Sequence, residues 1–151
     1  MIYQGAIPVF IDSETETWNM DPILLEDAIN NYIKIGRKPK AIILVHLYGY
    51  PAKIDQFLEI SNKYNIPIVE DAAEAIGSKY KDQPLGTFGK IGVFSFNGNK
   101  IITTSSGGAL ISKNKEFIKK AKFLATQSRD CLLYTSPSPR DATLSRMPSS
   151  A

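Results

Sequence analysis

The sequence has almost none of the side chains that build disulfides and metal centres. Its 151 residues include one cysteine, Cys131, and one histidine, His46. A single cysteine cannot form a disulfide within the chain, and these two residues cannot supply the ligand cluster of a structural metal site. Low cysteine content is typical of proteins in a reducing compartment, so we expect a cytoplasmic location.

Long hydrophobic runs and one-sided charge are also missing. No apolar stretch approaches the ~20 residues of a membrane-spanning helix, and the first residues lack the basic and apolar regions of a signal peptide. The 18 basic and 15 acidic residues give a net charge of +3, with no basic block interleaved with aromatic residues. We therefore expect neither a membrane nor a nucleic acid as a partner.

The apolar residues that are present alternate between two periodicities. Continuous apolar runs of strand length occur at residues 7–11, 41–45 and 66–69. Between these runs, apolar residues recur at helical spacing after Asp21-Pro22 and after Asp55, and both aspartates are predicted to cap helices. This alternation predicts right-handed βαβ units, and hence a three-layer α/β/α fold with a mainly parallel sheet.

The second half of the chain follows a different order. Residues 77–92 contain four glycines and are predicted to form a loop with little regular structure. Strands are expected at residues 91–96 and 109–111, followed by a lysine-rich amphipathic helix over residues 113–126.

Lys100 lies between two stretches that are predicted to be buried. An ammonium group is costly in such a place. The lysine is therefore either paired with an anion or used as an amine nucleophile. Taken alone, the residue pattern favours the paired, structural role over the chemical one.

Asp71 follows directly after the apolar strand at residues 66–69, at the edge where ligands bind in open α/β sheets. Its carboxylate could cap a short helix, hold a metal or pair with a protonated ring nitrogen of a cofactor. No second ligand cluster supports the metal. Asp71 together with Lys100 is the minimal protein equipment for pyridoxal phosphate chemistry. Ser95, on the turn before the lysine, is either an ordinary turn serine or a donor to the cofactor phosphate.

Several segments carry a family resemblance. Residues 70–77 (EDAAEAIG) and 94–104 (FSFNGNKIITT), with Gly107-Gly108, resemble the DegT/DnrJ/EryC1/StrS sugar aminotransferases, which are fold-type I pyridoxal phosphate enzymes. The resemblance covers roughly residues 3–130, including residues 46–49 (HLYG) and 86–89 (GTFG). Residues 97–100 (NGNK) are most similar to the branch that aminates UDP-4-keto-6-deoxy-N-acetylhexosamines on the way to bacillosamine or legionaminic acid.

The resemblance implies a role for each matching residue. Lys100 would hold the cofactor and move the proton in catalysis, and Asp71 would pair with the pyridinium nitrogen. Glu74, where many members have glutamine, would lie near the cofactor's phenolic oxygen, and Ser95 would bind the phosphate. His46 keeps two interpretations, a histidine satisfied at a strand end or a catalytic one, of which the first is favoured.

The resemblance also implies partners: a nucleotide-linked 4-keto sugar as substrate, glutamate as amino donor and a homodimer for the full-length protein. One departure concerns Ser105-Ser106, which replaces the commoner glycine-containing pairs. If Ser106 takes a positive φ that glycine would otherwise supply, strain is expected there.

The resemblance implies that residues 1–130 are a central fragment of the large domain. The family's N-terminal phosphate-binding turn and stacking aromatic, and its C-terminal domain, find no counterpart. Residues 131–151 are rich in serine and proline without an apolar period, which predicts a disordered tail, and they resemble non-native read-through. The alternative function is therefore an inactive, truncated α/β domain with no catalytic role.

Overall fold

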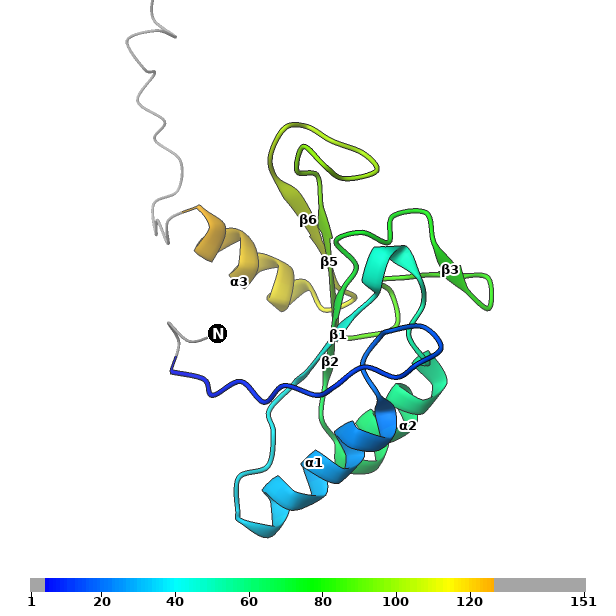
Figure 1. Ribbon diagram of the computed structural model, residues 1–151. Helices are drawn as coiled ribbons and strands as arrows, with labels where there is room; N and C mark the ends of the chain where they lie inside the picture. Colours follow the sequence, from blue (N-terminus) through cyan, green and yellow to red (C-terminus); the bar gives the residue numbers. More distant parts are fainter. Residues whose placement is uncertain (1–4, 127–151) are drawn as a thin grey trace, which may run out of the picture. The chain divides into compact units, whose positions relative to one another are not determined.

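The computed structural model describes residues 5–126 (Figure 1). The chain divides into two units, residues 1–119 and residues 120–151. The predicted tail over residues 131–151 and Cys131 lie outside the described residues. The first unit contains the sheet and all the sites considered below. Of the second unit the structure describes only residues 120–126, which include the end of a helix.

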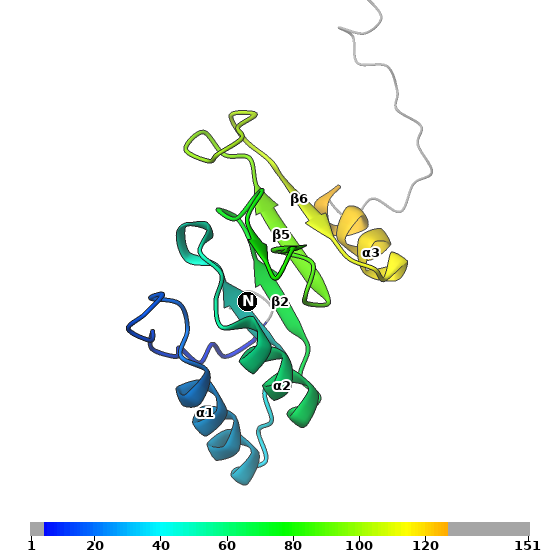
Figure 2. The same cartoon turned by 90° about the vertical axis from the view of Figure 1, so that its right-hand side faces the viewer.

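A four-stranded sheet forms the framework of the first unit. Its strands are β1 (Ile42–Val45), β2 (Ile68–Asp71), β5 (Ile91–Ser95) and β6 (Gly108–Ile111), in the order β1-β2-β5-β6 (Figure 2). The first three run parallel, and β6 pairs antiparallel with β5. The predicted α/β class and mainly parallel sheet are confirmed.

Two helices cover one face of this sheet. They are α1 (Pro22–Lys34) and α2 (Ile54–Tyr64), and a third helix, α3 (Lys115–Ala125), runs from the first unit into the second. The core between the helices and the sheet consists of Leu25, Ile29, Ile42, Leu44, Ala52, Phe57, Ile60, Ile66 and Ile68. Because side chains alternate along a strand, Val45 and Val93 lie on the opposite face, where they are 43% and 37% exposed. The helices and the sheet are two of the three predicted layers.

The two predicted helix caps differ. Asp21 caps α1, because its carboxylate accepts hydrogen bonds from the backbone N–H groups of Ile23 and Leu24 at 2.7 and 3.2 Å. Asp55 does not cap α2; it lies inside the first turn and accepts hydrogen bonds from Tyr80 and Lys81 instead. The hydroxyl of Tyr80 and the ammonium of Lys81, both distant in sequence, thus bind the carboxylate that the local pattern predicted as the helix cap.

The predicted strand over residues 7–11 is wrong, and the predicted loop over residues 77–92 is incomplete. Residues 7–11 form no strand, because no strand of the described residues pairs with them, and Ile7 and Phe10 are 77% and 90% exposed. The loop over residues 77–92 contains a short antiparallel pair, β3 (Lys79–Tyr80) and β4 (Gln83–Pro84). None of the helices in the described part of the chain is long and apolar enough to cross a bilayer.

Candidate active site

The predicted site residues gather at the carboxyl ends of two neighbouring parallel strands. Asp71 is the last residue of β2, Ser95 is the last residue of β5, and Lys100 follows in the loop after β5. Asp71 Oδ1 accepts a hydrogen bond from the backbone N–H of Ala73 at 3.1 Å, and Ser95 Oγ accepts one from Asn97 at 3.4 Å. The contact of Ser95 is that of the predicted turn serine, whereas the short helix that Asp71 could have capped does not form, and residues 72–77 are turns.

Lys100 is paired with Glu74. Its Nζ lies 3.1 Å from Glu74 Oε1, and the two side chains are 17% and 34% exposed. The other carboxylate oxygen of Glu74 accepts a hydrogen bond from the backbone N–H of Tyr48 at 3.1 Å. The pKa of Glu74 is held below its usual value mainly by the hydrogen bond from Lys100 and, after it, by that from the Tyr48 N–H. Lys100 is thus paired with an anion, as the residue pattern favoured, and the partner is a residue predicted to belong to the same site.

Tyr48 belongs to a turn of unusual backbone shape. The turn contains the short 3-10 helix η2 (Leu47–Gly49), in which Tyr48 has a φ of +51° and Gly49 a φ of +80°. A Cβ on Gly49 would lie 2.7 Å from the backbone oxygen of Glu74, so only glycine allows this approach. Sequence reasoning missed Tyr48, because its contribution comes from the main chain.

The histidine is satisfied within the interior. His46 is 1% exposed, its Nε2 lies 3.1 Å from Glu70 Oε2, and its Nδ1 accepts a hydrogen bond from the backbone N–H of Ala52 at 3.3 Å. Because Nδ1 is an acceptor, this hydrogen-bond geometry assigns the ring proton to Nε2, which donates to Glu70. Both ring nitrogens are engaged, which agrees with the favoured interpretation of His46.

Glu70 is a fully buried carboxylate that sequence reasoning overlooked. It also accepts hydrogen bonds from the backbone N–H groups of Gly86 at 2.8 Å and Gly89 at 2.5 Å. Burial raises the pKa of the Glu70 carboxyl, but the bonds from His46, Gly89 and Gly86 together hold it below its usual value. The available signal was a glutamate directly after the apolar run at residues 66–69, where a charge that becomes buried requires partners.

The two glycines that contact Glu70 are required by space. A Cβ on Gly86, which has a φ of +84°, would lie 2.6 Å from the Phe94 ring, and one on Gly89 would lie 2.7 Å from the backbone oxygen of Ile68. Glycine at both positions lets the main chain come close enough for its N–H groups to reach the carboxylate. Residues 86–89 therefore bind an anion that the protein itself supplies.

The loop after β5 folds back on itself. The backbone N–H of Phe96 donates to Gly107 O, and that of Thr104 donates to Phe96 O, both at 3.0 Å. The positive φ expected at Ser106 occurs at Ser105 instead, with a value of +68°. The strain predicted for the serine pair therefore falls one residue earlier, at the start of the turn into β6.

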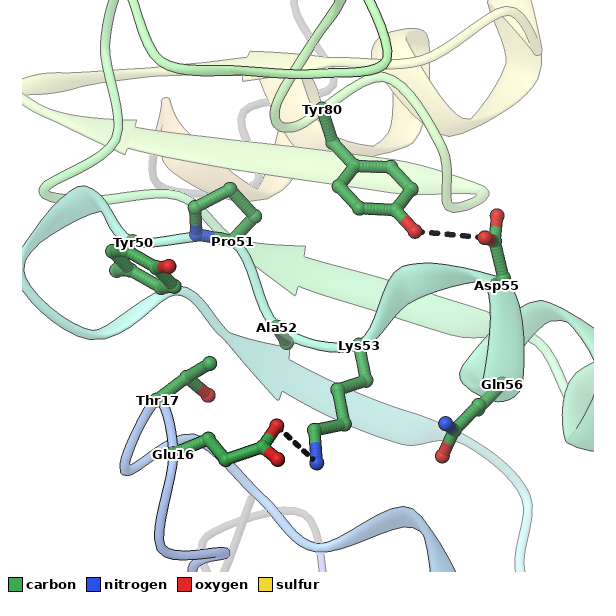
Figure 3. A pocket seen from close by; sticks show the side chains of 9 residues that line it. All are labelled: Glu16, Thr17, Tyr50, Pro51, Ala52, Lys53, Asp55, Gln56 and Tyr80. Carbon is green, nitrogen blue, oxygen red and sulfur yellow. Dashed lines mark hydrogen bonds and ion pairs between the residues drawn. The ribbon is translucent and has the colours of Figure 1, made fainter.

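A pocket of about 430 Å³ lies apart from these residues (Figure 3). Its lining consists of Glu16, Thr17, Tyr50, Pro51, Ala52, Lys53, Asp55, Gln56 and Tyr80. Lys53 Nζ bonds Glu16 at 2.9 Å and Tyr80 bonds Asp55 at 2.7 Å, so its charged groups are already paired. Neither Lys100 nor Asp71 contributes to it.

The chemistry of the residues at the strand ends fits pyridoxal phosphate. They offer an amine for its aldehyde, a carboxylate for its ring nitrogen and a hydroxyl for its phosphate. Asp71 keeps one carboxylate oxygen without a hydrogen bond to any described residue. In the part of the chain that the structure describes, no group of three acidic, histidine or cysteine side chains could hold a metal ion.

Comparisons with known proteins identify the family of the chain. The model of the DegT/DnrJ/EryC1/StrS aminotransferase family matches residues 1–134. EpsN of Bacillus subtilis, provisionally named a pyridoxal phosphate-dependent aminotransferase, is 52% identical over 130 residues, which cover 86% of this chain and 34% of EpsN. GDP-perosamine synthase of Escherichia coli O157:H7 is 48% identical over 113 residues, which cover 75% of this chain and 29% of the synthase.

A solved structure shows the same partial coverage. The crystal structure of a DegT DnrJ EryC1 StrS aminotransferase from Brucella abortus matches with a TM-score of 0.79 and 34% identity, over 85% of this chain and 35% of that one. The chain thus spans about a third of the length of the proteins that it matches, at 34%, 29% and 35%.

Proposed function

The chain belongs to the DegT/DnrJ/EryC1/StrS aminotransferase family and is homologous to pyridoxal phosphate-dependent sugar aminotransferases, and on this premise we propose that it carries the cofactor lysine of such an enzyme. The reaction proposed is transamination of a nucleotide-linked 4-keto-6-deoxy sugar to the 4-amino sugar. The observation that carries the proposal is the partly buried Lys100, paired with Glu74 beside the carboxyl ends of β2 and β5.

Each residue would contribute one step of binding or proton handling. Bound pyridoxal phosphate supplies an electron sink for the substrate carbon. Lys100 Nζ would hold it through its aldehyde carbon, and as a free amine would take and return the proton. The Asp71 carboxylate would keep the ring nitrogen protonated, and the Ser95 hydroxyl would donate to the phosphate. Glu74 would face the phenolic oxygen, where one of the two groups must carry a proton.

The proposed substrate is a UDP-4-keto-6-deoxy-N-acetylhexosamine of the bacillosamine or legionaminic acid type, with glutamate as amino donor. The resemblance of residues 97–100 supports this choice, and a relative named GDP-perosamine synthase supports a nucleotide sugar more generally. A homodimer of the full-length protein and a cytoplasmic location belong to the same proposal.

The alternative is a truncated α/β domain without catalytic activity. What favours it is that the chain covers 34% of EpsN and 29% of the perosamine synthase. On this alternative, the phosphate and the ring are held by groups from the remaining two thirds of such proteins.

Reductive labelling separates the two functions. The 151-residue chain is incubated with pyridoxal phosphate, reduced with borohydride and mapped by peptide mass. The proposal predicts an adduct at Lys100 that disappears in Lys100→Ala. Lys63 serves as the control lysine, because its ammonium is paired with Glu26 at 2.7 Å while its side chain is 64% exposed. Labelling spread over exposed lysines without preference for Lys100 would support the inactive domain.

A further inference from the structure

A continuous series of contacts joins the buried histidine to the candidate cofactor lysine. It begins at His46, whose ring is held at both nitrogens by Glu70 and by the N–H of Ala52. The main chain of His46 is fixed as well, since its N–H donates to Asp71 O and its carbonyl accepts from Gly49 N–H, both at 3.1 Å. His46 therefore fixes both ends of the turn formed by residues 47–52.

The turn over residues 47–52 presents a backbone donor to Glu74. Tyr48 is 85% exposed, so packing of its ring does not explain why this residue adopts a positive φ. The turn is held by its main chain, through Tyr50 N–H to Leu47 O at 2.9 Å, and by Asn19, whose side chain bonds the backbone of Leu47 and of Tyr50. The result is that Tyr48 N–H points at Glu74 Oε2, at 3.1 Å.

Glu74 transmits this position to the lysine. One of its oxygens is taken by Tyr48 N–H and the other by Lys100 Nζ, at 3.1 Å each. Lys100 is also the least exposed of the described lysines that form ion pairs: its side chain is 17% exposed, against 30%, 64%, 70% and 74% for Lys53, Lys63, Lys81 and Lys119.

We infer that His46 is a positioning residue for Lys100, acting through the turn over residues 47–52 and the Glu74 carboxylate without touching the cofactor. The inference deepens the function proposed above and rests on it for the identity of Lys100 as the cofactor lysine. In this role the buried histidine helps to set the position of the reactive amine, which goes beyond packing and is not a catalytic role.

Acetylation of lysines in the absence of cofactor tests this coupling. The 151-residue chain receives a short pulse of acetic anhydride, and peptide masses give the acetylation of Lys100 relative to Lys63. Because the Glu74 pair holds Lys100 in a partly buried position, Glu74→Ala should raise this ratio several-fold. His46→Gln should raise it similarly, since it releases the turn that positions Glu74.

The double variant carries the decisive comparison. If His46 acts through Glu74, adding His46→Gln to Glu74→Ala leaves the ratio at the level of Glu74→Ala alone. The inference is overturned if His46→Gln leaves the ratio at the wild-type value. It is equally overturned if the two substitutions multiply in the double variant.

A second substitution keeps the test valid if His46→Gln does not fold, which far-ultraviolet circular dichroism reports. Gly49→Ala would press a methyl group against Glu74 O, to which an ideal Cβ lies only 2.7 Å away, and leaves the buried pair intact. It should raise Lys100 acetylation alone, with no further rise in the Glu74→Ala background. A rise shared by Lys63 and Lys119 would overturn the inference, because it would show general loosening.

The two levels of proposal fail in different ways. If the cofactor lysine is misassigned, reductive labelling misses Lys100 while the acetylation coupling to His46 persists. If the positioning role is wrong, Lys100 takes the pyridoxal label, but substitutions of His46 and Gly49 do not change its acetylation.

Discussion

Replacing Glu70 with glutamine tests whether the internal anion stabilises the fold. The carboxylate accepts three hydrogen bonds, from His46 Nε2–H and from the N–H groups of Gly86 and Gly89. Glutamine has the same shape but offers one acceptor oxygen and one donor NH₂. At least one of the three donors must then face another donor.

The size of the effect follows from this count. A buried donor left without an acceptor costs about 1–3 kcal/mol. The remaining bonds also lose the ionic character that makes charge-assisted hydrogen bonds about twice as strong as neutral ones. We therefore expect Glu70→Gln to lower the free energy of unfolding by about 2–4 kcal/mol.

Urea unfolding followed by circular dichroism at pH 7 measures this difference. The matched control is Glu59→Gln, which makes the same chemical change at an exposed position of α2 and should stay within about 0.5 kcal/mol of wild type. An effect of Glu70→Gln no larger than that of the control would refute the reasoning, because the three bonds would then add nothing to stability.

The same pair of proteins has a defined pH dependence. The native-state pKa of Glu70 is lowered, so its contribution is fully present above the unfolded-state pKa of about 4.3 and is lost as the pH falls through the native value. The stability gap between wild type and Glu70→Gln should therefore shrink on acidification. A gap that stays constant from neutral pH into the acid range would contradict the lowered pKa.

Three further substitutions probe the framework, each read from its urea unfolding curve. Gly92→Ala should destabilise by about 1–3 kcal/mol or more, because the new Cβ would lie 2.0 Å from the backbone oxygen of Gly86. An unchanged midpoint would mean that the loop at Gly86 does not pack this closely on β5. Phe57→Ala empties a fully buried position and should cost about 3–5 kcal/mol, whereas a cost below that of an ordinary surface change would place Phe57 outside the core. Asp21→Ala removes the α1 cap and should cost about 1 kcal/mol, which Asp21→Asn should largely restore.

Local patterns predicted most of the regular structure. The apolar runs at residues 41–45 and 66–69 became β1 and β2, because a continuous apolar run of that length suits a buried parallel strand. The Asp21-Pro22 pair placed the start of α1 correctly, since both residues act through their immediate neighbours. The strand predicted for the equally apolar residues 7–11 does not form, because a strand also needs a pairing partner and the sequence of one segment does not show which partner it has.

The site was predictable in its groups and less so in its connections. The sequence predicted that Lys100 is either paired with an anion or used as a nucleophile. It did not predict the partner, because Glu74 lies 26 residues away and only the order of the strands brings the two side chains together. The contribution of Tyr48 escaped prediction because every residue except proline has the same backbone N–H, and only the fold decides where it points.

The adjacent residues Glu70 and Asp71 show why register matters more than residue type at this site. Successive side chains of a strand point to opposite faces. Glu70 therefore faces the helices, where the chain's own donors occupy both of its oxygens and leave nothing for a ligand. Asp71 faces the other way and keeps one oxygen without a partner among the described residues. Shifting β2 by a single residue would turn Glu70 and Asp71 to opposite faces, so the hydrogen bonds that fix Glu70 also keep Asp71 on the face of the proposed cofactor site.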